Sequence, residues 1–163
     1  MSLYYSRKIS LFAFLICLGL LGIAMYLQYS LGLQPCPLCV VQRVCIALLA
    51  LIFMVGSLYI PRSRLIRWIY SLFTVIFAGL GIAAALRHLW LEHLPPGSVP
   101  SCSASLDYML QNFPMSQTLI QLFNGSGDCA QITWQFLTLT IPAWTLIFFA
   151  VFLLIGLLRL TRP

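Results

Sequence analysis

The chain has 163 residues, of which 61% are hydrophobic and only 7% are charged. Its mean hydropathy is +0.99. A chain with so little polar surface cannot coat a water-soluble globule of this size, so the composition excludes a soluble protein and predicts an integral membrane protein in contact with lipid. The net charge of +6 does not indicate a nucleic-acid partner, because the basic residues lie at the ends of apolar stretches and form no run interleaved with aromatic side chains.

Four apolar stretches have the roughly 20 residues that an α-helix needs to span a bilayer. They run from about Ile9 to Tyr29, from Val40 to Ile60, from Ile66 to Trp90 and from Ile141 to Leu160. The first stretch is too long for the core of a signal peptide, and no small-x-small cleavage site follows it, so we expect it to remain as a helix. The sequence therefore predicts a single all-α domain over residues 1–163, built as a bundle of four transmembrane helices.

The positive charges of the chain gather on one side of these helices. Cytoplasmic ends of membrane proteins carry an excess of Lys and Arg. Seven basic residues are cytoplasmic by this rule: Arg7, Lys8, Arg62, Arg64, Arg67, Arg159 and Arg162. Both termini are then cytoplasmic, and the short connection 30–39 and the long connection 91–140 lie on the opposite, outer side.

Four cysteines fall on that outer side. Cys36 and Cys39 form a Cys-x-x-Cys motif at the start of the second helix, and Cys102 and Cys129 lie in the long connection. A Cys-x-x-Cys motif alone is compatible with a redox pair, a structural disulfide or half of a zinc site. We assign no metal, because the long connection has no second such motif. Two thiol pairs on the side where disulfides persist favour a redox relay, and two static disulfides are the alternative.

The position of the first pair on its helix predicts its chemistry. Sulfurs at a helix start lie near the positive end of the helix dipole, which favours the thiolate. Arg43 lies four residues after Cys39, on the same face and one turn deeper, where its guanidinium could stabilise a thiolate or an anionic ligand. Cys17 and Cys45 lie inside predicted helices, and we expect them to behave as small apolar side chains.

The motifs are specific enough to indicate a family. They are Cys36-Pro37-Leu38-Cys39-Val40-Val41-Gln42-Arg43, then Glu92-His93 after the third helix, and Gly125-Ser126-Gly127-Asp128-Cys129-Ala130 before the fourth. With four helices and two cysteine pairs in this order, the chain resembles the bacterial disulfide-bond formation protein B family, DsbB, over essentially its whole length. The family often has a glycine where this chain has Thr138.

The resemblance implies a reaction and its partners. A reduced periplasmic thioredoxin-fold oxidase of the DsbA type would attack the Cys102–Cys129 disulfide, and Cys102 would form the mixed disulfide. Thiol exchange would then pass the electrons to Cys36 and Cys39. Cys39, close to Arg43, would next reduce a bound quinone, either ubiquinone or menaquinone, which carries the electrons to the respiratory chain.

The resemblance also implies a location and one further site residue. The chain would lie in the bacterial inner membrane, with both termini cytoplasmic and both cysteine-bearing loops periplasmic. His93 would help to form the pocket for the quinone head group. The small residues of segment 78–85 predict close helix packing, or room for an isoprenoid tail.

Two segments of the long connection suit such a relay. The proline-rich stretch 94–100 predicts a mobile connection ahead of Cys102, because proline interrupts regular helix. Residues 115–123 place apolar side chains at helical spacing, which predicts a short amphipathic helix on the membrane surface.

Two other classes of protein share some of these features. A vitamin K epoxide reductase-like enzyme is also a quinone-linked helical bundle with two cysteine pairs, but that family places its Cys-x-x-Cys late in the chain. A non-catalytic membrane protein could hold structural disulfides or a metal. That class gives no reason for a cation at Arg43, one turn below Cys39.

Overall fold

Four long helices and a short β-hairpin make up the described part of the chain. The computed structural model describes residues 2–30, 32, 36–59, 63–93, 135–136 and 138–161. The elements are α1 (Ser2–Ser30), α2 (Pro37–Leu58), α3 (Arg64–Glu92), β1 (Gln135–Phe136), β2 (Leu139–Thr140) and α6 (Ile141–Thr161). The expected mobile stretch 94–100 and the expected surface helix 115–123 lie outside the described residues.

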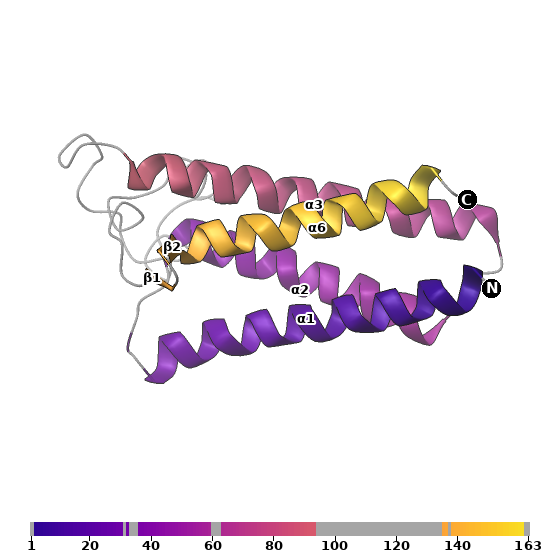
Figure 1. Ribbon diagram of the computed structural model, residues 1–163, viewed down its shortest axis with the longest axis horizontal. Helices are drawn as coiled ribbons and strands as arrows, with labels where there is room; N and C mark the ends of the chain where they lie inside the picture. The colour runs from indigo at the N-terminus through magenta and orange to yellow at the C-terminus, as the bar shows by residue number, and fades with distance from the viewer. Residues whose placement is uncertain are drawn as a thin grey trace, which may run out of the picture.

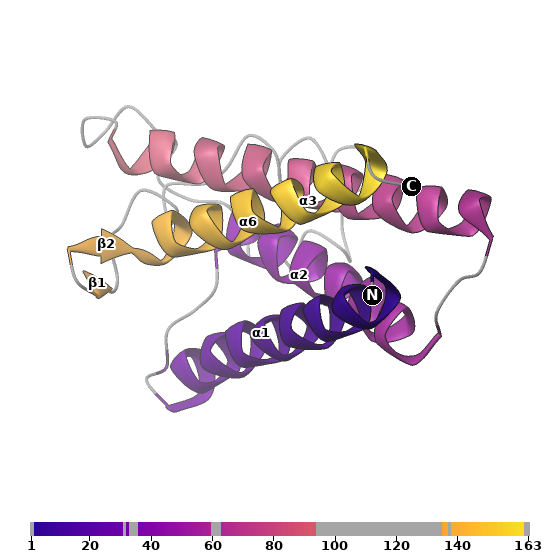
Figure 2. The same ribbon diagram turned by 45° about the vertical axis from the view of Figure 1, so that its right-hand side comes forward.

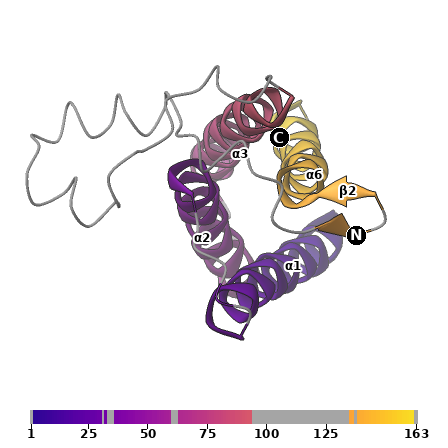
Figure 3. The same ribbon diagram turned by 90° about the vertical axis from the view of Figure 1, so that its left-hand side faces the viewer.

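The helices form an up-and-down bundle (Figure 1). Viewed along its length, α1 packs on α2, α2 on α3 and α3 on α6 (Figure 3). Each of the four is long and apolar enough to cross a membrane. The predicted all-α fold with four membrane-spanning helices is therefore confirmed.

Large apolar side chains cover the outside of the bundle as well as its interior. Exposed examples from all four helices are Phe12, Tyr26, Leu51, Trp68, Leu86 and Leu154. Such a surface would drive association in water, whereas in a bilayer it faces lipid tails that are equally apolar. Burial of apolar area therefore contributes little to holding these helices together in the membrane, and close packing contributes more.

The interior is rich in aromatic rings. Phe53 on α2 and Phe152 on α6 meet in a tilted arrangement with ring centroids 5.4 Å apart, a geometry that aromatic pairs favour. Cys17 and Cys45 are buried in the same apolar cluster. These two cysteines thus fill space among apolar side chains, as expected.

One polar contact closes the bundle near the chain termini. Nη2 of Arg159, near the end of α6, donates a hydrogen bond to Oγ of the buried Ser10 on α1 at 3.0 Å. Both termini lie at this end of the bundle (Figure 1). The contact joins the first and last helices where the chain carries most of its basic residues.

The hairpin before α6 is a feature that the helical pattern did not predict. It pairs Gln135 with Thr140 and Phe136 with Leu139, and it leads directly into α6 (Figure 2). Thr138 in its turn has a φ of 65°. This left-handed conformation costs a residue with a Cβ about 1 kcal/mol or more, whereas glycine adopts it readily. The glycine that the resemblance leads one to expect at this position would adopt the conformation without that cost.

Glycines allow α3 and α6 to approach closely. A Cβ on Gly81 would overlap the ring of Phe149, and a Cβ on Gly156 would come within 2.9 Å of a methyl group of Val75. By contrast, a Cβ on Gly79 would meet nothing within 4 Å. Of the glycines in the small-residue segment 78–85, Gly81 is thus the one that the close packing requires.

We expect Gly81→Ala to lower the free energy of unfolding by about 1–3 kcal/mol, because the added methyl overpacks the helix contact. Gly79→Ala is the matched control on the same helix, and it should leave stability unchanged or raise it slightly, since alanine favours helix. Thermal or denaturant unfolding of both variants in detergent micelles measures the difference. Equal stability of the two variants would contradict the packing role of Gly81.

Candidate active site

The first turn of α2 holds both cysteines of the Cys-x-x-Cys motif. Cys36 is the N-cap residue, and its Sγ accepts a hydrogen bond from the backbone N–H of Cys39 at 3.4 Å. Pro37 begins the helix because it has no N–H to leave unpaired and a φ that suits the first turn. The helix thus begins earlier than the expected Val40, and both sulfurs lie at its positive end.

The two sulfurs are close to bonding distance. They are thiols in this structure, and Cys36 Sγ lies 3.2 Å from Cys39 Sγ. A disulfide has a bond of about 2.05 Å, so small side-chain rotations would bring the sulfurs together. Cys36 is buried against Leu38 and Leu91, while Cys39 is partly exposed. The motif therefore has the geometry of a pair that alternates between dithiol and disulfide.

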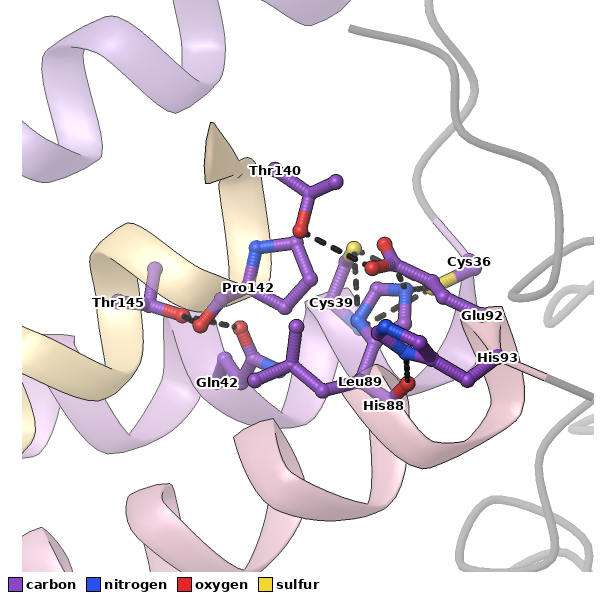
Figure 4. A network of polar contacts seen from close by, with 10 residues as sticks. All are labelled: Cys36, Cys39, Gln42, His88, Leu89, Glu92, His93, Thr140, Pro142 and Thr145. Carbon is purple, nitrogen blue, oxygen red and sulfur yellow. Dashed lines mark hydrogen bonds and ion pairs between the residues drawn. The ribbon is translucent and has the colours of Figure 1, made fainter. Parts of the chain in front are cut away.

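A buried histidine on α3 faces both cysteines. His88 Nε2 lies 3.8 Å from Cys36 Sγ, and His88 Nδ1 lies 3.9 Å from Cys39 Sγ (Figure 4). Both distances are longer than those between nitrogen and oxygen in hydrogen bonds, as contacts with the larger sulfur atom are. Each ring nitrogen of His88 faces a different thiol. Imidazole exchanges protons near neutral pH, so this arrangement provides the pair with a base.

The same three side chains have the composition of a metal site. Their ligand atoms all lie within 4.8 Å of one another. Cysteine and histidine are the ligands that zinc prefers, but a zinc ion takes one nitrogen from an imidazole ring. Because Cys36 and Cys39 face different nitrogens of His88, the geometry favours proton exchange with each thiol over a shared metal ion.

Two residues support His88 from behind. Glu92, one helical turn further along α3, places Oε1 at 3.9 Å from His88 Nε2. Its other oxygen, Oε2, accepts a hydrogen bond from Thr140 Oγ1 at 3.0 Å. Thr140 directly precedes α6, so this contact ties the end of α3 to the start of α6 (Figure 4).

Gln42 lies near the cysteines and contributes a buried amide group to the site. It lies one turn after Cys39 on α2, is buried, and its Oε1 accepts a hydrogen bond from Thr145 Oγ1 at 2.9 Å. Its Nε2 is buried without a hydrogen-bond partner among the described residues. An unpaired buried donor costs about 1–3 kcal/mol, which a ligand with an acceptor oxygen would relieve.

Arg43 lies where the spacing predicts, one turn after Cys39, but its guanidinium extends to α1. It donates one hydrogen bond to Gln28 Oε1 and another, of 3.1 Å, to the carbonyl oxygen of Ala24. Among the described residues, neither bond goes to a cysteine. Arg43 therefore joins α2 to the last turns of α1, and its expected role toward the quinone stays a prediction.

His93, the histidine singled out from the sequence, is not the one beside the cysteines. It is exposed, and its Nδ1 donates to the carbonyl oxygen of Leu89 at 2.7 Å. His88 was missed, although its spacing of four residues from Glu92 is a signal for a histidine–carboxylate pair on one helix face. Cys102 and Cys129 lie outside the described residues, so their roles also stay predictions.

A dithiol and a buried histidine at one end of an apolar four-helix bundle define a membrane thiol oxidoreductase. Comparison with known proteins gives the particular family. The model of the family described as "Disulfide bond formation protein DsbB" matches residues 6–159.

Three relatives named disulfide bond formation protein B, one of them with the number 1, are similar to the chain over most of its length. The protein of Methylococcus capsulatus is 45% identical over 149 residues, covering 91% of this chain and 90% of the relative. The protein of Chromohalobacter salexigens is 44% identical over 151 residues, covering 93% and 88%. Protein B 1 of Pseudomonas aeruginosa is 39% identical over 162 residues, covering 99% of each chain. The chain belongs to the DsbB family, and it is a multi-pass membrane oxidoreductase of disulfide bond formation.

The contacts of the two histidines predict different effects on the thiols. We expect His88→Gln to lower the alkylation rate of the reduced Cys36–Cys39 pair at neutral pH by about tenfold or more, because the thiols lose their base. His93→Gln should leave that rate unchanged, since His93 is directed at a backbone carbonyl. Site-resolved mass spectrometry after brief iodoacetamide treatment measures both rates. A larger effect from His93→Gln would contradict the assignment.

Proposed function

We propose that the protein reoxidises a periplasmic DsbA-like thioredoxin-fold oxidase and passes the electrons through two cysteine pairs to a membrane quinone. The observation that carries the proposal is the close pair Cys36 and Cys39, held against His88 at the end of a membrane-spanning bundle. A thiol pair at that depth can meet a lipid-soluble electron acceptor. Membership of the DsbB family supports the same reaction.

The proposed location is the bacterial inner membrane, with the termini cytoplasmic and the cysteines periplasmic. The distribution of charge supports this orientation. Five described basic residues lie in or beside the helix ends opposite the cysteines: Arg7, Lys8, Arg64, Arg67 and Arg159. Disulfides form and persist in the periplasm, and the proposed orientation places the thiol pair on that side of the membrane.

The side chains around the first pair suit a quinone. Nε2 of Gln42 is buried without a hydrogen-bond partner in the described part of the chain and is available to donate to a carbonyl oxygen. The buried Leu38 and Leu91 line the end of the bundle with apolar surface. When bound, a quinone, either ubiquinone or menaquinone, supplies a sink for two electrons and two protons. The proposed roles of Arg43 and His93 in holding it rest on the resemblance, whereas the contacts of His88 favour that histidine as the one that handles protons from the thiols.

A second pair in the long connection would serve the protein partner. Thiol exchange requires a thiolate to touch a disulfide sulfur, so a pair in a polar connection suits a bulky thioredoxin-fold partner better than a pair partly buried at the end of the bundle. Cys102 and Cys129 lie in the only long stretch of polar composition in the sequence. We therefore assign the partner to this pair, with Cys102 as the attacked sulfur, and the respiratory chain to the quinone side.

Quinone reduction tests the proposed function directly. The purified protein in lipid nanodiscs should reduce a soluble quinone analogue when supplied with a reduced thioredoxin-fold donor. Cys39→Ser should abolish this, because the remaining thiol cannot close a disulfide. Cys45→Ala, a change of a buried cysteine on the same helix, is the control and should retain the activity. Failure of the wild type to reduce the quinone would refute the proposal.

A trapped intermediate tests the order of the relay. In Cys129→Ala, the Cys102 thiolate would first exchange with the oxidised Cys36–Cys39 pair and form a disulfide with one of those cysteines. The thiolate of a partner that lacks its own resolving cysteine would then displace that cysteine, and the mixed disulfide between Cys102 and the partner should accumulate because neither side has a second thiol to resolve it. The species runs as a band of summed mass on a non-reducing gel. Cys102→Ala should give much less of it. Equal trapping by the two variants would overturn the assignment of Cys102.

A further inference from the structure

Glu92 occupies a position that the proposed electron relay leaves unexplained. Only 6% of the His88 side chain and 5% of the Glu92 side chain are exposed, so water screens their interaction little. A carboxylate at the edge of a bilayer is costly without partners. Both of its oxygens are engaged, one facing His88 Nε2 at 3.9 Å and the other bound to Thr140 Oγ1 at 3.0 Å.

The two nitrogens of His88 face different groups. Nδ1 faces Cys39, whereas Nε2 faces both Cys36 and Glu92. An ionised carboxylate only accepts hydrogen bonds, so Glu92 favours a proton on Nε2. The lone pair of Nδ1 is then directed at the Cys39 thiol. Thiol, imidazole and carboxylate in this order match the arrangement of nucleophile, base and orienting acid in hydrolytic enzymes.

We infer that Glu92 is a positioning residue that sets the tautomer of His88 and balances its charge, so that His88 takes the proton from Cys39. In this step the S–H bond of Cys39 breaks, an N–H bond forms at Nδ1, and no electrons are transferred. The products are a thiolate and an imidazolium, with the carboxylate on the far side of the ring. The inference rests on the proposed function only for the later use of the thiolate.

Thr140 holds the Glu92 carboxylate in position by a hydrogen bond. Its hydroxyl fixes Oε2 from the start of α6, so that Oε1 points toward the ring (Figure 4). The distance of 3.9 Å between Oε1 and Nε2 is that of an ion pair and longer than a hydrogen bond. An imidazolium would draw the carboxylate closer, because opposite charges attract strongly where water screens them little.

The other charged groups near the site are directed elsewhere in the described structure. Arg87 lies over the ring of Trp90 at 4.5 Å, and Arg43 is bound to α1. His93, on the same helix, donates to a backbone carbonyl. Of the titratable groups in the described residues, the two thiols from α2 and Glu92 from α3 face His88, and the uncharged Thr140 of β2 binds Glu92.

A positioning role for Glu92 and simple charge repulsion predict opposite changes in the alkylation rate of Cys39 when Glu92 is removed. If Glu92 acted on the thiols only through its negative charge, its removal would favour the thiolate and speed the alkylation of Cys39. If it acts through His88, its removal weakens the base and slows the alkylation. Glu92→Gln separates the two cases, because the amide keeps the shape and the acceptor for Thr140.

The experiment follows the alkylation rate of Cys39 against pH in the reduced full-length protein in nanodiscs, resolved by mass spectrometry. Glu92→Gln should lower the rate at neutral pH about tenfold and move the midpoint of the profile up by about one pH unit. Glu92→Asp, which keeps the charge, should recover part of the rate. An unchanged or faster rate in Glu92→Gln would overturn the inference.

A double variant shows whether the effect passes through the histidine. In a His88→Gln background, Glu92→Gln should cause no further slowing, because the base is already absent. An equal slowing in both backgrounds would overturn the positioning role. The readout involves no quinone, so a wild-type protein that fails to reduce quinone while Glu92→Gln slows alkylation would refute the proposed function and leave this inference standing.

Discussion

A bilayer offers no water to pair with polar groups inside it, so every polar side chain in the bundle needs a protein partner or a ligand. Buried Ser57, Ser71 and Thr74 meet this constraint by bonding to carbonyl oxygens of their own helices, whereas the cysteine end of the bundle meets it with contacts between side chains. Cys36 and Cys39 meet His88, which meets Glu92, which binds Thr140. This chain of contacts joins α2, α3 and the start of α6, so the reactive pair and the helix arrangement depend on each other.

Close helix packing is what brings these groups together. Lipid-facing apolar surface does little to hold the helices, so their relative positions are set by contacts such as Gly81 against Phe149. That contact fixes α6 along α3, and Thr140, the last residue of β2 directly before α6, then reaches Glu92. A change in the middle of the bundle can thus reach the redox site without touching a cysteine.

The sequence allowed the spanning helices to be predicted because each one needs only length and apolar composition. It also placed the Cys-x-x-Cys motif at a helix start. It did not single out His88, because a histidine inside an apolar stretch gains its meaning from the helix opposite, and that pairing is a tertiary property. His93 was expected at the quinone site because of the resemblance, whereas in the structure its ring is bound to a carbonyl oxygen of its own helix. For Arg43, the spacing predicted the face of α2 on which the residue lies. It could not predict that the long side chain would bind α1.

Oxidation of a dithiol releases two protons with its two electrons, and Arg43 and His88 differ in whether they can accept a proton. The guanidinium of Arg43 can stabilise an anion, but it stays protonated and cannot accept a proton from a thiol. His88 can do so, and it touches both sulfurs. The fixed cation on α2 and the imidazole on α3 therefore have complementary capacities at this site: one can stabilise an anion, and the other can accept a proton.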